Sequence, residues 1–89
     1  MATTDLDAET AMAALETLEQ MIERQRARVL AIARRLRPGL AEDDLRNAHA
    51  LPELQQDPEF EFEAGQLAGL RAARIALQAR LVEGTVAQG

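Results

Sequence analysis

The single histidine of the chain, His49, is the residue type best suited to acid–base or metal chemistry. One imidazole beside several carboxylates can bind a divalent metal ion or act as a general base. The spacing of these residues matches no established ligand pattern, so we interpret His49 as a solvent-facing or locally hydrogen-bonded loop residue. A metal- or small-molecule-binding helical bundle stays as a weaker alternative. The carboxylates of this stretch belong to Asp43, Asp44, Glu53 and Asp57.

A second set of acids alternates along the sequence at Asp57, Glu59, Glu61 and Glu63. On a helix these side chains spread around the axis and do not converge as a pair for acid–base catalysis. The chain also lacks a Ser/His/Asp set, a phosphate loop and a nucleotide-binding fingerprint, and it has no Glu-x-x-His pair of the di-iron type. We therefore predict that the protein is not an enzyme and has no catalytic, cofactor-binding or metal-ligating residues.

Six arginines without an intervening acid occupy residues 24–37 and are the best candidates for binding an anionic partner. Arg24, Arg28 and Arg35 lie toward one side of a helix, so a nucleic-acid-associated or regulatory role is an alternative hypothesis. It is disfavoured because the net charge is −5 and neither a helix-turn-helix spacing nor stacking aromatic residues are present. Membrane binding is not predicted, because the apolar stripe of this helix follows a seam for a partner helix.

The composition predicts a small all-α protein. Its 89 residues allow one domain, and with two phenylalanines and no tryptophan or tyrosine the core must consist mainly of aliphatic side chains. Ala, Leu, Glu, Gln and Arg favour helix throughout. The chain has no cysteine, no apolar run of roughly 20 residues for a membrane span and no apolar segment typical of a secretory signal. We expect a cytoplasmic protein.

The first predicted element is a long helix at about residues 5–37. Thr4 and Asp7 fit a capping box, and Pro38 and Gly39 stop the helix. Apolar residues recur every three or four positions, which is typical of a coiled-coil-like seam. Gln25 is the one polar member of this stripe, and it either fixes the register or lies at the edge in water. The apolar members are Ala8, Ala11, Leu15, Leu18, Ile22, Val29, Ile32 and Leu36.

Residues 38–57 form a connector between the two long helices. Within it, residues 41–48 are compatible with a short helix, and an extended stretch is predicted between Pro52 and Pro58. Regularly spaced leucines argue against a disordered linker, and a connection of this length is commonly ordered. We expect these leucines to pack against the helix pair and close its end. They are Leu40, Leu45, Leu51 and Leu54.

A second helix is predicted at about residues 58–83, with Asp57 as N-cap and Pro58 in the first turn, followed by a frayed tail at 84–89. Its narrow polar arc contains Glu63, Arg71, Arg74 and Gln78, with Leu67 intruding. The rest of its surface is apolar on two sides. The larger apolar face contains Leu70, Leu77 and Leu81, and the smaller one contains Ala64, Gly65, Ala68, Gly69, Ala72, Ala76 and Ala79.

Two apolar faces on one helix need more than one neighbour, because a single hairpin would leave an apolar strip in water. We therefore predict an antiparallel helical hairpin that pairs with a second copy as a homodimeric four-helix bundle. The two glycines indicate that a neighbouring backbone approaches closely along the small face. The predicted packing and oligomer contacts are Leu15, Leu18, Ile22, Gln25, Val29, Ile32, Leu36, Gly65, Gly69, Leu70, Ala72, Ala76, Leu77 and Leu81.

The charges alternate in blocks that favour the antiparallel hairpin. The balance is −6 over residues 1–23, +6 over 24–37, −7 over 38–63 and +2 over 64–89. Each exposed ion pair adds only ~0–1 kcal/mol, but a parallel arrangement would bring acid against acid. The expected pairs are Glu59 with Arg37, Glu61 with Arg35, Glu63 with Arg34, Glu23 with Arg74 and Glu16 with Arg80.

From these patterns we predict a small non-catalytic assembly or adaptor protein. Its partners would be a second copy of itself and another protein that the sequence does not identify. No cofactor, nucleic acid or membrane is expected to take part.

Overall fold

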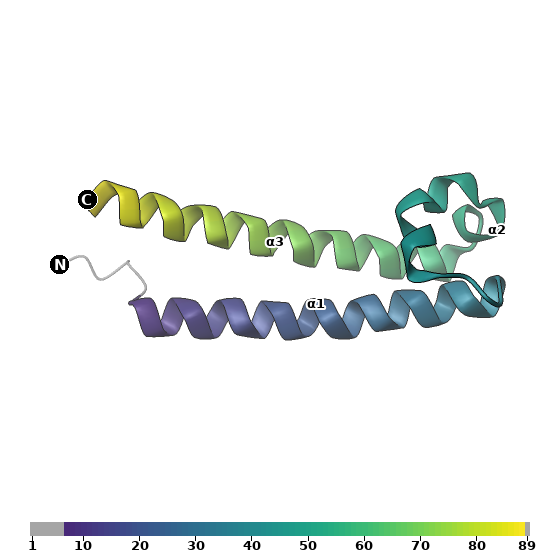
Figure 1. Ribbon diagram of the computed structural model, residues 1–89, viewed down its shortest axis with the longest axis horizontal. Helices are drawn as coiled ribbons and strands as arrows, with labels where there is room; N and C mark the ends of the chain where they lie inside the picture. The colour runs from purple at the N-terminus through teal and green to yellow at the C-terminus, as the bar shows by residue number, and fades with distance from the viewer. Residues whose placement is uncertain (1–6, 89) are drawn as a thin grey trace.

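The computed structural model describes residues 7–88, with side chains placed for residues 7–82, and it forms an antiparallel hairpin of two long helices. Helix α1 spans Ala8–Leu36 and helix α3 spans Pro58–Gln88. The 3-10 helix η1 (Glu42–Ala50) and the one-turn helix α2 (Pro52–Gln55) form the connector at one end (Figure 1). No strand occurs among the described residues, so the predicted all-α class is confirmed.

The N-cap of α1 is Asp7, whereas the predicted capping residue Thr4 lies outside the described residues. The carboxylate of Asp7 accepts the Thr10 N–H at 2.7 Å, which satisfies one of the free donors of the first turn. This hydrogen bond holds the pKa of Asp7 below its ordinary value. The helix ends at Leu36, just before the predicted stop, and Gly39 has a φ of +85°, a left-handed conformation that favours glycine.

The connector contains more helix than we predicted. The short helix expected at residues 41–48 is present as η1, with a kink at Asn47. The extended stretch expected after Pro52 is wrong, because Pro52 begins α2, where its fixed φ suits the first turn of a helix. The expected packing of the four leucines is confirmed: Leu40 and Leu54 are buried in the core, and Leu45 and Leu51 are partly buried against it.

The core lies at the connector end of the hairpin. It joins residues from α1, the connector and α3, including Val29, Leu54 and Phe60. Phe62 follows two residues later and is 61% exposed, so the two aromatic rings point in different directions. Beyond Leu67, none of the described α3 side chains is buried, and the two helices draw apart toward the chain ends (Figure 1). The full core cluster is Ile22, Val29, Ile32, Ala33, Leu40, Leu54, Phe60 and Leu67.

Helix α3 begins as predicted and continues further than predicted. The carboxylate of Asp57 accepts the Phe60 N–H at 2.8 Å, which confirms Asp57 as the cap. The helix passes the predicted end near Glu83 and reaches Gln88. A single glycine, Gly84, costs about 1 kcal/mol relative to alanine inside a helix, which does not by itself end one.

Candidate interaction surface

A polar cluster joins the two long helices within their otherwise apolar seam. The side-chain Nε2 of Gln25 donates to the backbone carbonyl of Glu63 at 2.9 Å and to its carboxylate Oε1 at 2.7 Å. The other carboxylate oxygen of Glu63 lies 3.2 Å from the Arg28 Nε, and this glutamate side chain is only 12% exposed. Gln25 is therefore half-buried and tied to one position on α3, which matches a register-fixing residue rather than one at the edge in water.

Acids of the same chain pair with four of the six arginines in residues 24–37. Arg35 contacts Glu59 at 2.6 Å, and Arg37 contacts Glu53 at 3.4 Å. Arg28 contacts Glu63, and Arg26 lies between two carboxylates, those of Glu23 and Glu42. The hydrogen bond from Arg26 holds the pKa of Glu23 below its ordinary value. Arg34 donates to the backbone carbonyl of Leu40 at 2.9 Å, and no ion pair involves Arg24 among the described residues.

The individual ion pairs that we predicted from the charge blocks are wrong. Glu59 pairs with Arg35 rather than Arg37, and Glu63 with Arg28 rather than Arg34, a shift of two to six residues toward the start of α1. The C-cap of α1, Arg37, pairs with Glu53 of the folded connector instead of with Glu59 of α3, and Glu59 pairs with Arg35 one half-turn earlier. Antiparallel pairing of opposite charges remains, in another register.

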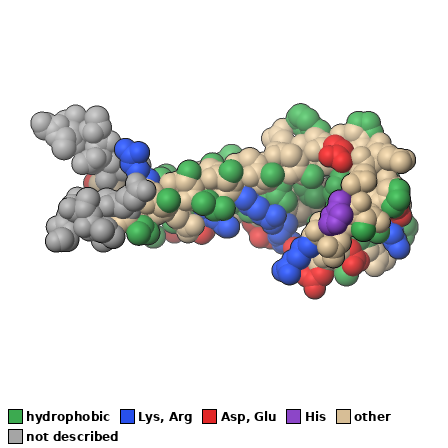
Figure 2. Space-filling model, turned by 90° about the horizontal axis from the view of Figure 1, so that it is seen from above, with side chains coloured by type: hydrophobic (Ala, Val, Ile, Leu, Met, Phe, Trp, Pro, Cys, Tyr) green, Lys and Arg blue, Asp and Glu red, His purple; other side chains and the backbone are tan. Residues whose placement is uncertain are grey.

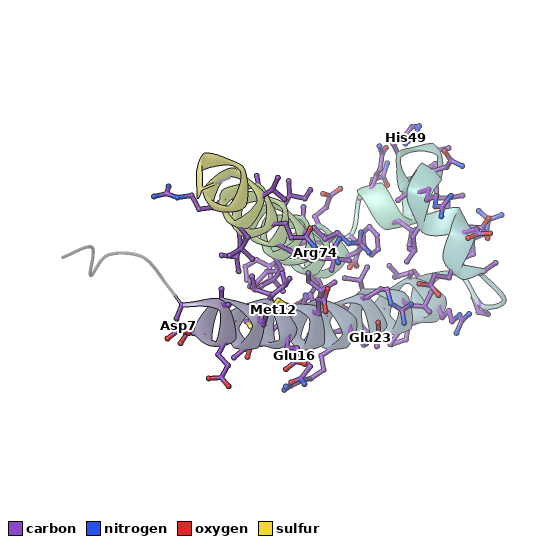
Figure 3. The ribbon with its side chains drawn as sticks, turned by 60° about the vertical axis from the view of Figure 1, so that its left-hand side comes forward. Asp7, Met12, Glu16, Glu23, His49 and Arg74 are labelled. Atoms are coloured by element: carbon purple, nitrogen blue, oxygen red, sulfur yellow. The ribbon has the colours of Figure 1, made fainter. Side chains whose placement is uncertain are left out.

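The predicted pairs nearer the open end also fail, because the side chains involved point in different directions. Arg74 lies on the side of α3 that faces α1, whereas Glu16 and Glu23 lie on the side of α1 away from α3 (Figure 3). Glu23 pairs instead with Arg26 within its own helix. The Arg74 Nε is buried and has no hydrogen-bond partner.

The polar arc of α3 is turned partly toward α1. Glu63 and Arg74 in this arc are half-buried, and Leu67, which seemed to interrupt it, is a core residue with 6% exposure. The larger apolar face lies beside it, with Leu70, Leu77 and Leu81 half-buried. The larger face is thus the one used within the chain.

Most of the small apolar face of α3 is exposed on the side away from α1, and we call this exposed part the outer face. The first member of the small face, Ala64, is instead half-buried against the core. A Cβ atom added at Gly65 or Gly69 would meet nothing within 4 Å beyond the helix itself. Three large side chains add to its apolar character, with Phe62 at 61% exposure and Ile75 and Val82 at 62%. Figure 2 looks onto α3 from above and shows hydrophobic side chains and backbone along the helix, with charged side chains near its borders. The outer face consists of Phe62, Gly65, Ala68, Gly69, Ala72, Ile75, Ala76, Ala79 and Val82.

The residues that we predicted as packing or oligomer contacts divide into two groups. Those of α1 face the interior of the hairpin: Ile22, Val29 and Ile32 are buried, and Leu15, Leu18, Gln25 and Leu36 are half-buried. On α3, the glycines and alanines of the set are exposed. The three candidate contacts for an anionic partner, Arg24, Arg28 and Arg35, are all exposed. Arg28 and Arg35 form ion pairs with acids of the same chain.

The residues considered for metal binding do not form a cluster in the described part of the chain. His49 is exposed on η1, at the outer rim of the connector (Figure 3). Among the described residues, no three His, Asp or Glu side chains lie close enough together to hold a metal ion. A shallow groove is lined by Arg28, Ala31, Ile32, Arg35 and Glu59. Its charged side chains already take part in ion pairs, Arg28 with Glu63 and Arg35 with Glu59.

Comparisons with protein-family models, curated proteins and solved structures found no match. No stretch of the described helices is apolar and long enough to cross a bilayer.

Proposed function

We propose that this protein is a small non-catalytic assembly or adaptor protein, and that it acts by pairing with a second copy into a unit of four helices. The observation that carries the proposal is the exposed apolar outer face of α3, which no part of the described chain covers. Soluble monomers rarely leave a continuous apolar strip in water. A neighbouring helix from a second copy is the simplest cover.

The shape of the chain supports this proposal. Its Cα radius of gyration is 17.1 Å and its extents are 54 × 20 × 19 Å, whereas a compact chain of this length has a radius of about 12 Å. Its accessible surface is 6482 Å², against about 5,200 Å² for a compact protein of its mass. A standard interface covers about 800 Å² per partner, so one dimer contact would remove much of this excess.

The arginines of residues 24–37 do not carry a competing proposal. Four of them pair with acids of the same chain, which neutralises most of the positive surface that nucleic acid would need. Protein–protein assembly therefore explains more of the described surface than nucleic-acid binding does.

Light scattering of the purified chain at micromolar concentration tests the proposal. We expect twice the chain mass of 9.8 kDa. A folded, helical protein that stays at the mass of one chain at this concentration would contradict it.

A further inference from the structure

We propose that the outer face of α3 packs antiparallel against the same face of a second copy, with a two-fold axis between Gly69 and Ala72. Phe62 would then lie opposite Ala79 of the second copy, Gly65 opposite its Ala76, and Gly69 opposite its Ala72. This inference rests on the proposed function and adds to it the interface, its orientation and its register.

The spacing of the outer face is that of a helix–helix seam. Positions 62, 65, 69, 72, 76 and 79 alternate in steps of three and four, and all are exposed. Such a repeat places one line of side chains along a partner helix. The members at the centre of this line are glycine and alanine, and the glycines have open space where a Cβ would be. Small residues at a seam allow two backbones to approach closely.

Side-chain size favours the antiparallel orientation. Phe62 is the one large residue in the seam positions and lies near one end of the line. Antiparallel pairing places each Phe62 opposite a small alanine, so the separation of the two helices stays even from end to end. Parallel pairing would stack Phe62 on its own copy and hold the glycine positions apart. Interiors tolerate neither the resulting voids nor the overlap.

Charge also favours this orientation. In this antiparallel register Arg80 of one copy is level with Glu61 of the other, and Glu59 lies two residues, roughly 3 Å, further along the helix axis. Glu59 is 54% exposed at its side chain and binds Arg35 through one carboxylate oxygen, which leaves the second available. Parallel pairing would instead set the two Arg80 side chains at the same level, where like charges repel.

The stripe of α1 offers no comparable seam. Its central members, Ile22, Val29 and Ile32, are already buried within the hairpin. A second copy that docked on them would first have to open the core. The outer face of α3 can be covered without any change in the fold.

The absence of cysteine from the chain allows a direct test with introduced thiols. In the proposed register the two copies of Ala72 lie within the roughly 5–6 Å between Cα atoms that a disulfide requires. Under mild oxidation, Ala72→Cys should form at least about tenfold more linked dimer than a control, because its thiols are held together. The control is Ala27→Cys, the same substitution at an exposed position of α1.

A mixing experiment distinguishes the orientations. Phe62→Cys and Ala79→Cys should each fail to link with themselves and should link when mixed. Self-linking of Phe62→Cys would establish parallel pairing and overturn the proposal. If light scattering shows a dimer but none of these outer-face thiols links, the interface is elsewhere; the inference is then wrong and the proposed function stands. If the chain is a monomer, both fail.

Discussion

Gln25 of α1 reaches Glu63 of α3 through two hydrogen bonds, one to the backbone carbonyl and one to the carboxylate. Both bonds come from an uncharged amide, whereas the hydrogen bond from Arg35 of α1 to Glu59 of α3 has a charged donor. The Gln25–Glu63 contact sits between the buried side chains of Ile22 and Val29. Any slip of one helix past the other would leave half-buried polar groups without partners, so this pair fixes the register of the hairpin.

Removal of the Gln25 amide tests this role. Gln25→Ala should lower the free energy of unfolding by about 1–3 kcal/mol, because Glu63 would lose both bonds in a half-buried site. Gln20→Ala, at an exposed position of the same helix, is the matched control and should change it by less than about 0.5 kcal/mol. Urea unfolding at one fixed chain concentration measures both, and equal effects would contradict a specific role for Gln25.

The two phenylalanines allow a matched comparison of core and surface. Phe60 is 5% exposed and Phe62 is 61% exposed. Phe60→Ala should destabilise the hairpin by about 3–5 kcal/mol, the cost of a large cavity in a core. Phe62→Ala should leave the circular dichroism of the hairpin unchanged and should weaken self-association instead. A folded Phe60→Ala protein of ordinary stability would show that the described core is wrong.

Gly69→Leu should have opposite effects on the helix and on the assembly. Within one chain the new side chain meets nothing within 4 Å of its Cβ, and leucine favours helix over glycine by nearly 1 kcal/mol. In the proposed seam the same side chain would collide with a neighbouring helix. Overpacking of this kind costs about 1–3 kcal/mol, so the dissociation constant should rise at least about tenfold.

Gly69→Ala is the control for that experiment, because it changes the backbone preference with little added volume. Leu70→Arg is a contrast rather than a second seam variant, because Leu70 packs against the core within the chain, and it should lower the stability of the hairpin itself. Unchanged association in Gly69→Leu, measured by analytical ultracentrifugation, would refute the assignment of the interface to the outer face of α3.

The cap of α1 predicts a dependence of stability on pH. Hydrogen bonding from Thr10 lowers the pKa of Asp7 in the folded chain, so the ionised cap stabilises the fold above the ordinary pKa of aspartate. That contribution is lost as the pH falls through about 4 toward the lower folded pKa. The melting temperature of the wild type should therefore drop more between pH 6 and pH 3 than that of Asp7→Asn, whose neutral side chain can still cap. Parallel curves would contradict the role of the carboxylate.

Local sequence signals predicted much of this fold. The cap at Asp57, the stop at Pro38 and the stripe on α1 all depend on neighbouring residues, and the structure bears them out. The ion-pair register could not be predicted in this way. It depends on how the connector packs against the end of α1, which only the tertiary structure determines.

The orientation of α3 was the other feature hidden from the sequence. A helix with apolar residues on two sides gives no rule for which side turns inward. Leu67 is the one apolar residue within the polar arc, and its burial shows that the arc faces partly toward α1. Its polar neighbour Glu63 tolerates this position because Gln25 supplies a hydrogen bond and Arg28 an ion pair there.

In the proposed assembly two copies pair through the outer face of α3. Sedimentation equilibrium of the wild type and of Gly69→Leu, over the same range of micromolar concentrations, tests this pairing most directly. The pairing predicts about twice the 9.8 kDa chain mass for the wild type and a shift toward the single-chain mass for the variant. A wild type that sediments as a single folded chain, or a variant that pairs as tightly as the wild type, would contradict it.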